Sequence, residues 1–239
     1  MPGLTGAAWR RLVSAFGTPA AVLVQSQLAL SQVVDSRLAA AILGQSNSAA
    51  AESALDWASK PRRAILTMQD PRYPALLRET PDPPPLMYAA GRIELLERPA
   101  IAIVGSRNAT AQGMRNAEAF ARALSTAGIC VASGMALGID AAAHRAALEA
   151  VGSTVAVLGN GIDVVYPRRN ADLLQQVFAA GLVVSEFPLG TPPLATNFPR
   201  RNRIISGVAR GCLVVEAALA SGSLITARSA VDMGRDVFA

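Results

Sequence analysis

The stretch AIAIVGSRNATAQGMRNAEAFARALSTA, residues 100–127, decides the fold class. It begins with a continuous apolar run, Ala100–Gly105, and continues into Gly113–Ala127, where apolar side chains recur on one helical face. An entirely apolar strand followed by an amphipathic helix is typical of a parallel sheet with both faces covered. The glycine of Gly105-Ser106-Arg107 permits a tight turn between the two elements.

The same pattern repeats toward the carboxyl end of the chain. Further apolar runs occur at Ile129–Ala132, Thr154–Leu158, Leu182–Val184, Cys212–Val215 and Val237–Ala239. Helical patterns separate these runs, the clearest being Ile139–Ala150. The sequence therefore predicts an α/β fold over residues 100–239, a Rossmann-like parallel sheet with helices on both faces. Because a natural protein rarely stops in a strand, we expect this chain to lack a C-terminal extension.

Two regions precede the predicted sheet. Residues 1–60 contain three segments with helical spacing, which are Ala7–Phe16, Pro19–Leu28 and Ser31–Leu43. They predict a small helical N-terminal domain. Residues 61–99 contain proline-rich turns such as PDPPP at 81–85, and one strand-like run, Ala64–Thr67. We expect this region to be an extended linker that packs on the core.

Composition and charge narrow the classes of function. The 239 residues carry a formal net charge of +5, and Lys60 is the only lysine, so the positive charge is almost all arginine. Such a surplus is compatible with a polyanionic partner but does not identify one. The apolar stretches are far shorter than a bilayer span, and residues 1–12 do not resemble a signal peptide. We therefore expect a cytoplasmic protein that does not associate with membranes.

The residues that most often carry catalysis are scarce. His144 is the only histidine, four residues after Asp140 on the same helical face, and is interpreted either as a general base or, more simply, as a structural hydrogen-bonding group. One histidine excludes a His-rich metal site. We expect no metal, no cofactor and no catalytic residue, and hydrogen-bonding rather than nucleophilic roles for Ser133, Ser221 and Ser223.

The two cysteines, Cys130 and Cys212, both lie in apolar runs. Cysteine in such surroundings usually behaves as a small buried hydrophobic residue. A disulfide or a shared metal is the less favoured alternative.

Glycines and hydroxyl side chains gather where the predicted strands end. These ends read Gly105-Ser106-Arg107, Ser133-Gly134, Gly159-Asn160 and Ser221-Gly222-Ser223. The carboxyl ends of parallel strands meet at one edge of the sheet, where ligands of this architecture bind. Glycine admits a close ligand, and helix N-termini offer free N–H groups to phosphate. Each loop alone could be a tight turn, but together they predict a binding site.

The common nucleotide motifs do not fit these loops. A nicotinamide dinucleotide needs G-x-G-x-x-G after the first strand and an acidic residue at the end of the second. Here the first strand continues as Gly105-Ser106-Arg107 and the second ends in Ser133-Gly134. A phosphate loop with G-K-S or G-K-T does not occur in the sequence. Neither kind of site is therefore expected.

The segment NFPRRNR, residues 197–203, places Phe198 beside three arginines at the start of a predicted helix. Nucleobases stack on aromatic rings, which contributes about 1–3 kcal/mol per base, and guanidinium groups bind phosphates. The equally favoured alternative is that Phe198 anchors the core and the arginines form a solvated face.

Taken together, these motifs resemble the DprA family, also called Smf. The matching stretches are DPRYPALL at 70–77, DPPPLMYAAG at 82–91, GSRNATAQG at 105–113, SGMALGIDAAAH at 133–144, VAVLGNGIDVVYPRRN at 155–170, SEFPLG at 185–190, NFPRRNRIISG at 197–207 and VVEAALASGSLITARSA at 214–230. The helical region 1–60 is similar in character to the SAM-like or helix-hairpin-helix-like domains that precede the core in this family.

The resemblance implies a DNA-processing protein of natural transformation and competence. Such a protein binds and protects single-stranded DNA without strong sequence preference, helps to load RecA recombinase for DNA recombination, forms a homodimer and has no established catalytic activity. The DNA-binding residues implied by the motifs are Gly105, Ser106, Arg107, Ser133, Gly134, Gly159, Asn160, Phe198, Arg201, Asn202, Arg203, Ser221, Gly222 and Ser223. Among the arginines, the motifs favour Arg107 and Arg203 over Arg200.

An enzymatic alternative comes from the same superfamily of folds. Phosphoribohydrolases that act on nucleoside monophosphates carry P-G-G-x-G-T-x-x-E at a strand end, and the chain departs from this motif at residues 215–223. Glu186 and Glu216 are the acids that such an enzyme would place near a ribose.

Overall fold

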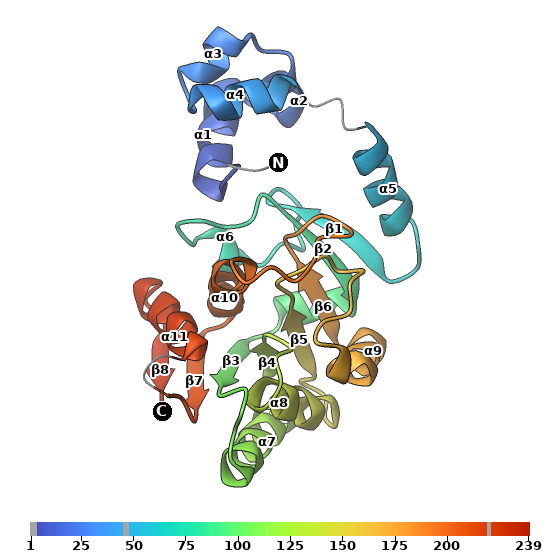
Figure 1. Cartoon of the computed structure of the whole chain (residues 1–239), viewed down its shortest axis with the longest axis vertical. Coiled ribbons are helices and arrows are strands. Elements are labelled where there is room, and N and C mark those ends of the chain that lie inside the picture. Colours follow the sequence, from blue (N-terminus) through green and yellow to red (C-terminus); the bar gives the residue numbers. More distant parts are fainter. Residues whose placement is uncertain (1–3, 45–47, 219–220) are drawn as a thin grey trace.

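The computed structural model describes residues 4–44, 48–218 and 221–239. Its centre is an eight-stranded sheet in the order β1-β2-β6-β5-β4-β3-β7-β8 (Figure 1). The strands from β3 onward run parallel to one another. They are β3 (Ala100–Gly105), β4 (Cys130–Ser133), β5 (Thr154–Val157), β6 (Leu182–Ser185), β7 (Gly211–Val215) and β8 (Asp236–Phe238). The predicted Rossmann-like α/β fold is confirmed.

Helices cover both faces of the sheet. Successive residues of each strand point to opposite sides, and in these strands both sets of side chains are apolar and need to be buried. In β3, Ile103 packs against α7 (Ala111–Thr126) and α8 (Ile139–Leu148), and α9 (Ala171–Ala180) lies beside α8. The neighbouring Ala102 and Val104 belong to the cluster on the other face. That cluster includes side chains of α10 (Asn197–Val208) and α11 (Gly222–Asp232).

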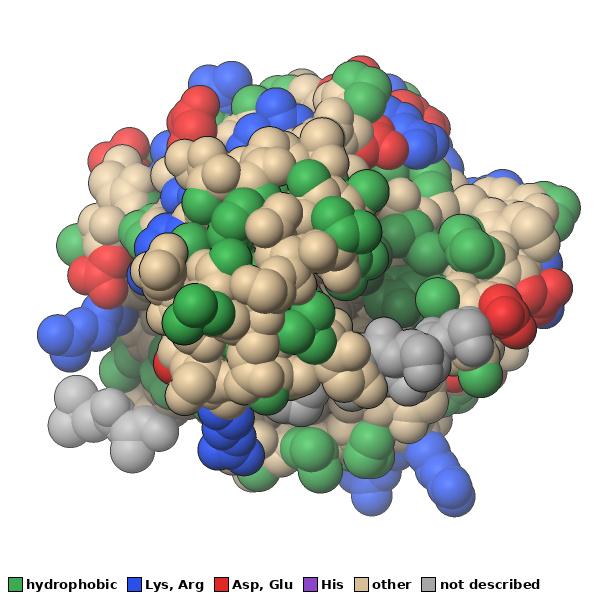
Figure 2. Space-filling view, turned by 90° about the horizontal axis from the view of Figure 1, so that it is seen from above, with side chains coloured by type: hydrophobic (Ala, Val, Ile, Leu, Met, Phe, Trp, Pro, Cys, Tyr) green, Lys and Arg blue, Asp and Glu red, His purple; other side chains and the backbone are tan. Residues whose placement is uncertain are grey.

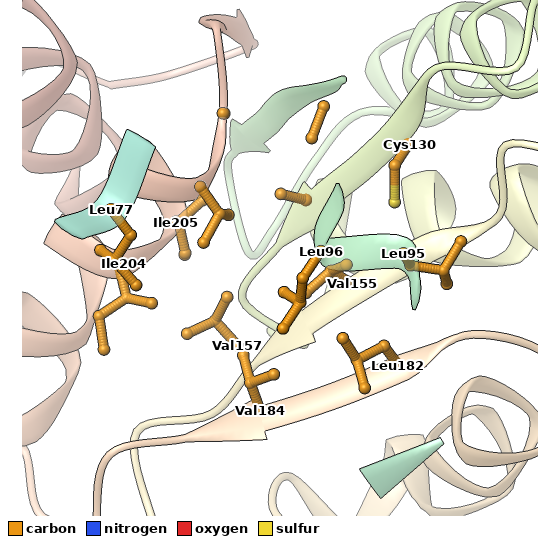
Figure 3. Close-up of a cluster of buried hydrophobic side chains, with 14 of the residues drawn as sticks. Leu77, Leu95, Leu96, Cys130, Val155, Val157, Leu182, Val184, Ile204 and Ile205 are labelled. Atoms are coloured by element: carbon orange, nitrogen blue, oxygen red, sulfur yellow. The ribbon is translucent and has the colours of Figure 1, made fainter. Parts of the chain in front are cut away.

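The larger hydrophobic cluster forms the centre of the core (Figure 3). Val155, Val157, Leu182 and Val184 project from neighbouring strands toward Ile204 and Ile205 of α10, and Leu77 closes the cluster from the side; all of these residues are buried. The core thereby fixes α10 across the sheet, which sets the position of every side chain on that helix.

Residues 61–99 are not the extended linker that the sequence predicted. They form β1 (Arg63–Thr67), α6 (Ala75–Arg78), β2 (Leu86–Gly91) and a short 3₁₀ helix, η1 (Ile93–Glu97). β1 and β2 pair antiparallel, and β2 pairs antiparallel with β6, so both strands belong to the central sheet. β2 reaches the rest of the sheet through β6, which lies far along the chain. The short apolar run of β2 follows a cluster of prolines, so no local signal marked it as a strand.

The amino-terminal region consists of short helices, as expected. They are α1 (Gly6–Phe16), α2 (Pro19–Leu23), α3 (Gln27–Ser31) and α4 (Ser36–Leu43). Leu12, Val22, Leu30 and Leu38 form part of a hydrophobic cluster made by these helices and the short segments beside them. Seen from this end, the surface mixes hydrophobic, arginine and acidic side chains and is hollowed on one side (Figure 2).

Several details of this region differ from the sequence prediction. The helix expected at Ser31–Leu43 begins only at Ser36, because the Asp35 side chain accepts a hydrogen bond from the Leu38 N–H and caps α4 there. The single helix expected at Pro19–Leu28 is divided into α2 and α3, because the Ser26 side chain accepts a hydrogen bond from the Ala29 N–H and starts a new helix. Helix α5 (Ser48–Ala58) packs on the sheet, where the rings of Trp57 and Tyr88 lie 5.5 Å apart edge to face. Residues 1–3 and 45–47 of the predicted domain lie outside the described residues.

None of the helices within the described residues combines the length and the hydropathy that crossing a bilayer requires.

The strand order places a topological switch point at β3. From β3 the chain proceeds outward through β4, β5 and β6, and then returns to form β7 on the other side of β3. The loops that follow β3 and β7 therefore diverge to opposite faces of the sheet and leave a crevice between them, where ligands of open α/β sheets bind.

Candidate functional site

A cavity of about 660 Å³ opens at this switch point. Three of the segments that form its walls are far apart in the sequence. The loop after β3 contributes residues 105–108, α10 contributes Phe198, Arg201 and Asn202, and the start of α11 contributes residues 221–223. The sequence motifs predicted this convergence, and nine of the residues named from them line the cavity: Gly105, Ser106, Arg107, Phe198, Arg201, Asn202, Ser221, Gly222 and Ser223.

An aromatic ring surrounded by cations occupies one wall. The guanidinium carbon of Arg107 lies 5.8 Å from the centroid of the Phe198 ring, and that of Arg201 lies 5.9 Å from it. The ring of Tyr166 is 5.6 Å away and tilted by 36°. Phe198 is only half-buried and lines the cavity, so it is not the buried core anchor of the alternative interpretation.

Gly159 makes room for this ring. A Cβ atom at position 159 would lie 2.7 Å from a ring carbon of Phe198, which is closer than real contacts allow. The glycine at the end of β5 therefore serves a packing purpose that the sequence pattern could not distinguish from a tight turn.

Arg107 is the accessible cation of the site. Its side chain is exposed, and within the described residues no carboxylate forms an ion pair with it. An exposed guanidinium whose charge is not neutralised locally is suited to bind a phosphate through paired hydrogen bonds.

Arg201 has a different role, because it is buried. Its NH1 group donates hydrogen bonds to the carbonyl oxygens of Val157 and of Gly134, the latter at 2.8 Å. Burial lowers the pKa of Arg201 to about 10, and the negative charge of Asp140 opposes that shift. Arg201 therefore links the ends of β4 and β5 to α10. It also forms a buried part of the cavity wall.

Asp140 complements this buried cation. Its Oδ2 atom accepts hydrogen bonds from the backbone N–H groups of Gly134 at 3.1 Å and Ala136 at 3.3 Å. Burial raises the pKa of the Asp140 carboxyl, while the charge of Arg201 acts in the opposite direction. Gly134 is required here because a Cβ atom would lie 2.6 Å from the Arg201 guanidinium.

Hydroxyl groups form the opposite rim. Ser221 caps α11: its Oγ accepts a hydrogen bond from the Ser223 N–H at 3.3 Å and lies 2.6 Å from the Ser223 Oγ. Asn202 Nδ2 donates to the Gly222 carbonyl at 3.2 Å and joins α10 to α11. The N-terminus of α11 thus borders the cavity, and its partial positive charge favours an anion there.

A smaller pocket of about 110 Å³ adjoins the cavity. Gly134, Gly159 and Asn160 line it, together with Arg107, Phe198 and Tyr166. The Asn160 amide donates to the carbonyl oxygens of Gly161 and Val164, so it holds the loop after β5. Sequence reasoning missed Tyr166, because it lies well beyond the end of β5 and only the folded loop brings it to the pocket.

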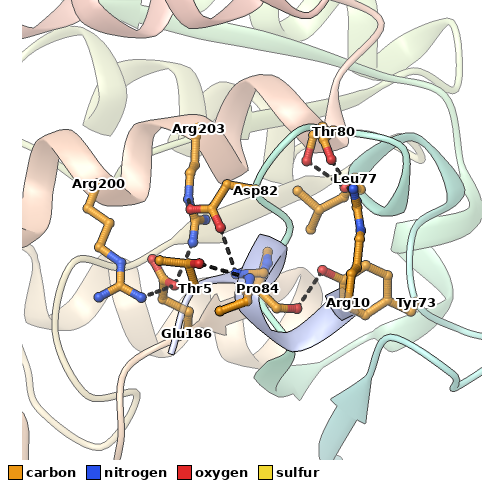
Figure 4. A network of polar contacts seen from close by, with 12 residues as sticks. Thr5, Arg10, Tyr73, Leu77, Thr80, Asp82, Pro84, Glu186, Arg200 and Arg203 are labelled. Atoms are coloured by element: carbon orange, nitrogen blue, oxygen red, sulfur yellow. Dashed lines mark hydrogen bonds and ion pairs between the residues drawn. The ribbon is translucent and has the colours of Figure 1, made fainter. Parts of the chain in front are cut away.

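Two of the predicted site residues lie elsewhere. Arg203 projects from the opposite face of α10, where its Nε is 3.1 Å from Asp82 and its NH2 is 2.7 Å from Glu186 (Figure 4). The Ser133 hydroxyl is buried and donates to the Ile103 carbonyl at 2.6 Å. Neither residue lines the cavity or the smaller pocket.

The two acids of the hydrolase alternative are engaged within the protein. Glu186 is bound by Arg200 at 3.0 Å and by Arg203, and its side chain is 3% exposed. Glu216 accepts hydrogen bonds from Thr110. Neither carboxylate is among the residues that line the cavity.

His144 has the structural role that the sequence favoured. Its Nδ1 lies 2.7 Å from the Thr154 hydroxyl, and its Nε2 accepts the Met135 N–H at 3.3 Å. Because Thr154 donates its own proton to Val131, Nδ1 carries the imidazole proton. Burial lowers the pKa of His144 to about 3, so the ring is neutral.

Cys130 and Cys212 are free and buried, as expected, and burial raises the pKa of each thiol to about 12. In the part of the chain that the structure describes, no cluster of His, Cys, Asp or Glu side chains is arranged to hold a metal ion.

Comparison with known sequences identifies related proteins. Residues 64–239 match the family described as DNA recombination-mediator protein A. The chain is 48% identical over 189 residues to Protein Smf of Escherichia coli, a match that covers 79% of this chain and 50% of the relative. It is 46% identical over 170 residues to DNA processing protein DprA of Streptococcus pneumoniae, covering 71% of this chain and 60% of the relative. The chain thus spans only about half the length of these curated relatives.

Solved structures agree with the sequence matches. The crystal structure of DprA from Streptococcus pneumoniae aligns with a TM-score of 0.85 and 34% identity, covering 98% of this chain and 81% of that one. DprA from Helicobacter pylori, a protein whose single-stranded DNA binding mode has been described, aligns with a TM-score of 0.68 and 28% identity, covering 74% of this chain and 79% of that one. The resemblance in the motifs is confirmed: the chain belongs to the DNA recombination-mediator protein A family, which comprises the DprA and Smf proteins.

Proposed function

We propose that this protein binds single-stranded DNA in the cavity at the switch point, without strong sequence preference. The observation that carries the proposal is the half-buried Phe198 ring, which lines the cavity beside the exposed guanidinium of Arg107. Bases of every kind can stack on an aromatic ring, whereas phosphates bind to arginine and to helix N-termini. A paired base has no free face or edge to offer such a cavity, so we expect duplex DNA to bind more weakly.

The binding test uses fluorescence anisotropy with oligothymidine, a mixed-sequence oligonucleotide of the same length and the matched duplex. We expect similar affinity for the two single strands, weaker binding of the duplex, and an affinity that falls steeply with salt. Arg107→Ala should weaken binding about tenfold for all sequences, and Phe198→Ala should cost about 1–3 kcal/mol. Arg122→Ala removes an exposed arginine from the last part of α7 and serves as the matched control. Equal affinity for duplex and single strand would refute the proposal.

The role in the cell is also a proposal, which the family supports. We infer that the protein protects single-stranded DNA and helps to load RecA recombinase during natural transformation, as a cytoplasmic homodimer that performs no catalysis. With this chain present, RecA-dependent ATP hydrolysis on single-stranded DNA should start sooner, and Arg107→Ala should abolish that effect. Light scattering tests the dimer, and unchanged RecA kinetics would count against loading.

A further inference from the structure

Glu216 holds both ends of the loop that carries Arg107. This residue follows β7, and its carbonyl accepts a hydrogen bond from the Ser106 N–H at 2.8 Å. Its carboxylate accepts the Thr110 N–H at 3.0 Å to each oxygen, and the Thr110 hydroxyl at 2.5 Å. Both the beginning and the end of the loop from 106 to 110 are therefore hydrogen-bonded to the one residue that follows the neighbouring strand β7.

The carboxylate also occupies the N-terminus of α7. Thr110 caps this helix, since its hydroxyl accepts the Gly113 N–H at 3.0 Å while donating to Glu216. A Cβ atom at Gly113 would lie 2.3 Å from Oε2 of Glu216, so glycine is needed to admit the carboxylate. In dinucleotide-binding sheets, the helix that follows the central strand receives a pyrophosphate at this end. Here an internal carboxylate takes that place.

The backbone of Glu216 is arranged for this contact. Its φ angle is +55°, in the left-handed region that a residue with a Cβ atom rarely adopts. Such conformations persist only where surrounding contacts stabilise them, and they concentrate at functional sites. The hydrogen bonds to Ser106 and Thr110 are those contacts.

We propose that Glu216 is the positioning residue of the Arg107 loop and fixes where the Arg107 guanidinium meets a phosphate of the bound strand. The inference rests on the proposed function of the cavity. It also explains why the helix end that dinucleotides use is closed to them here, while the N-terminus of α11 beside Ser221 remains open to the cavity.

The test is a double-mutant cycle on oligothymidine binding. If Glu216 acts through Arg107, Glu216→Ala should lower affinity about tenfold, which corresponds to about 1.4 kcal/mol, and should cause no further loss in the Arg107→Ala background. Glu216→Gln keeps an acceptor for the Thr110 N–H and should retain most of the affinity. The control is Glu97→Ala, which removes an exposed carboxylate at the end of η1, before the amino-terminal end of β3.

Hydrogen exchange of the peptide spanning residues 105–113 gives a second readout without DNA. Glu216→Ala should speed exchange there, whereas Arg107→Ala and Glu97→Ala should not. Wild-type affinity of Glu216→Ala, or losses that simply add in the double variant, would overturn the inference. If Arg107→Ala binds DNA normally, the proposed function fails instead, and the exchange experiment still decides whether Glu216 holds the loop.

Discussion

Two arginines of the same site show how burial decides the role of a single residue. Arg107 is exposed and its charge is available to a ligand, whereas Arg201 donates its hydrogen bonds to the carbonyls of Gly134 and Val157. Replacing the buried arginine removes a structural cation and leaves Asp140 without its counter-charge. For this reason, loss of binding after a change at Arg201 does not identify a DNA contact, while the same loss after a change at Arg107 does.

His144 makes stability depend on pH. Its pKa is lowered from 6.5 to about 3 in the folded protein, so below pH 6.5 the unfolded chain binds a proton that the folded chain does not. The contribution of the neutral His144 to the free energy of unfolding is therefore fully present above pH 6.5 and is lost as the pH falls toward 3. We expect this residue to lower the free energy of unfolding by about 2 kcal/mol between about pH 8 and about pH 5.

Urea unfolding of the wild type and of His144→Gln at several pH values measures this contribution. The amide of the substituted side chain cannot be protonated, so the difference in unfolding free energy between the two proteins should change with pH in the stated direction. A constant difference over this range would show that His144 does not titrate on unfolding.

At the scale of the element, the two sides of α10 have different surroundings. Phe198, Arg201 and Asn202 face the cavity, whereas Arg200 and Arg203 face Glu186 on the other side. Arg203 is 14% exposed and its partner Glu186 only 3%, so this ion pair is largely buried. The ion pair between Arg203 and Glu186 therefore helps to fix the position of α10, and with it the side chains that line the cavity.

Arg203→Ala should accordingly destabilise the protein, by about 3 kcal/mol, because Asp82 loses its cation and the buried Glu186 keeps only the exposed Arg200. Arg200→Ala, which removes a side chain that is 51% exposed, should cost less than about 1 kcal/mol. Urea unfolding of both variants measures the contrast. If Arg203→Ala instead keeps full stability and loses DNA affinity, Arg203 contacts the strand, as the family motif implied.

Local patterns predicted most elements, and long-range pairing explains the failures. The runs that became β3 and β7 are apolar throughout, which is typical of strands covered on both faces. β2 went unrecognised because it joins the sheet through β6, a partner that no neighbouring residue specifies. For α10, spacing alone could have placed Arg203 away from Phe198, since five residues along a helix lead to the opposite face. The proposal of single-stranded DNA as the ligand came from the family resemblance, because glycines and arginines fit many anions.

At the scale of the whole molecule, hydrogen bonds tie the amino-terminal helices to the core. Arg10 donates to the carbonyl oxygens of Arg78 at 2.6 Å and Thr80 at 2.7 Å (Figure 4). The Gly6 N–H donates to Asp82, which also binds Arg203 of α10. We propose that α1–α4, which share a hydrophobic cluster of their own, form a small domain held in this way against the side of α10 that faces away from the cavity.

The position of β3 in the sheet has a consequence for synthesis. β3 pairs with β4, which follows closely in the chain, and also with β7, which is much later. The pairing of Ala102 with Cys212 can therefore form only after β7 has been synthesised. A nascent chain that has not reached β7 leaves one edge of β3 unpaired, and exposed strand edges recruit other chains. The same chain lacks the α11 side of the cavity. During synthesis we therefore expect a stage that is prone to aggregation, and the cavity can form only after α11 has been translated.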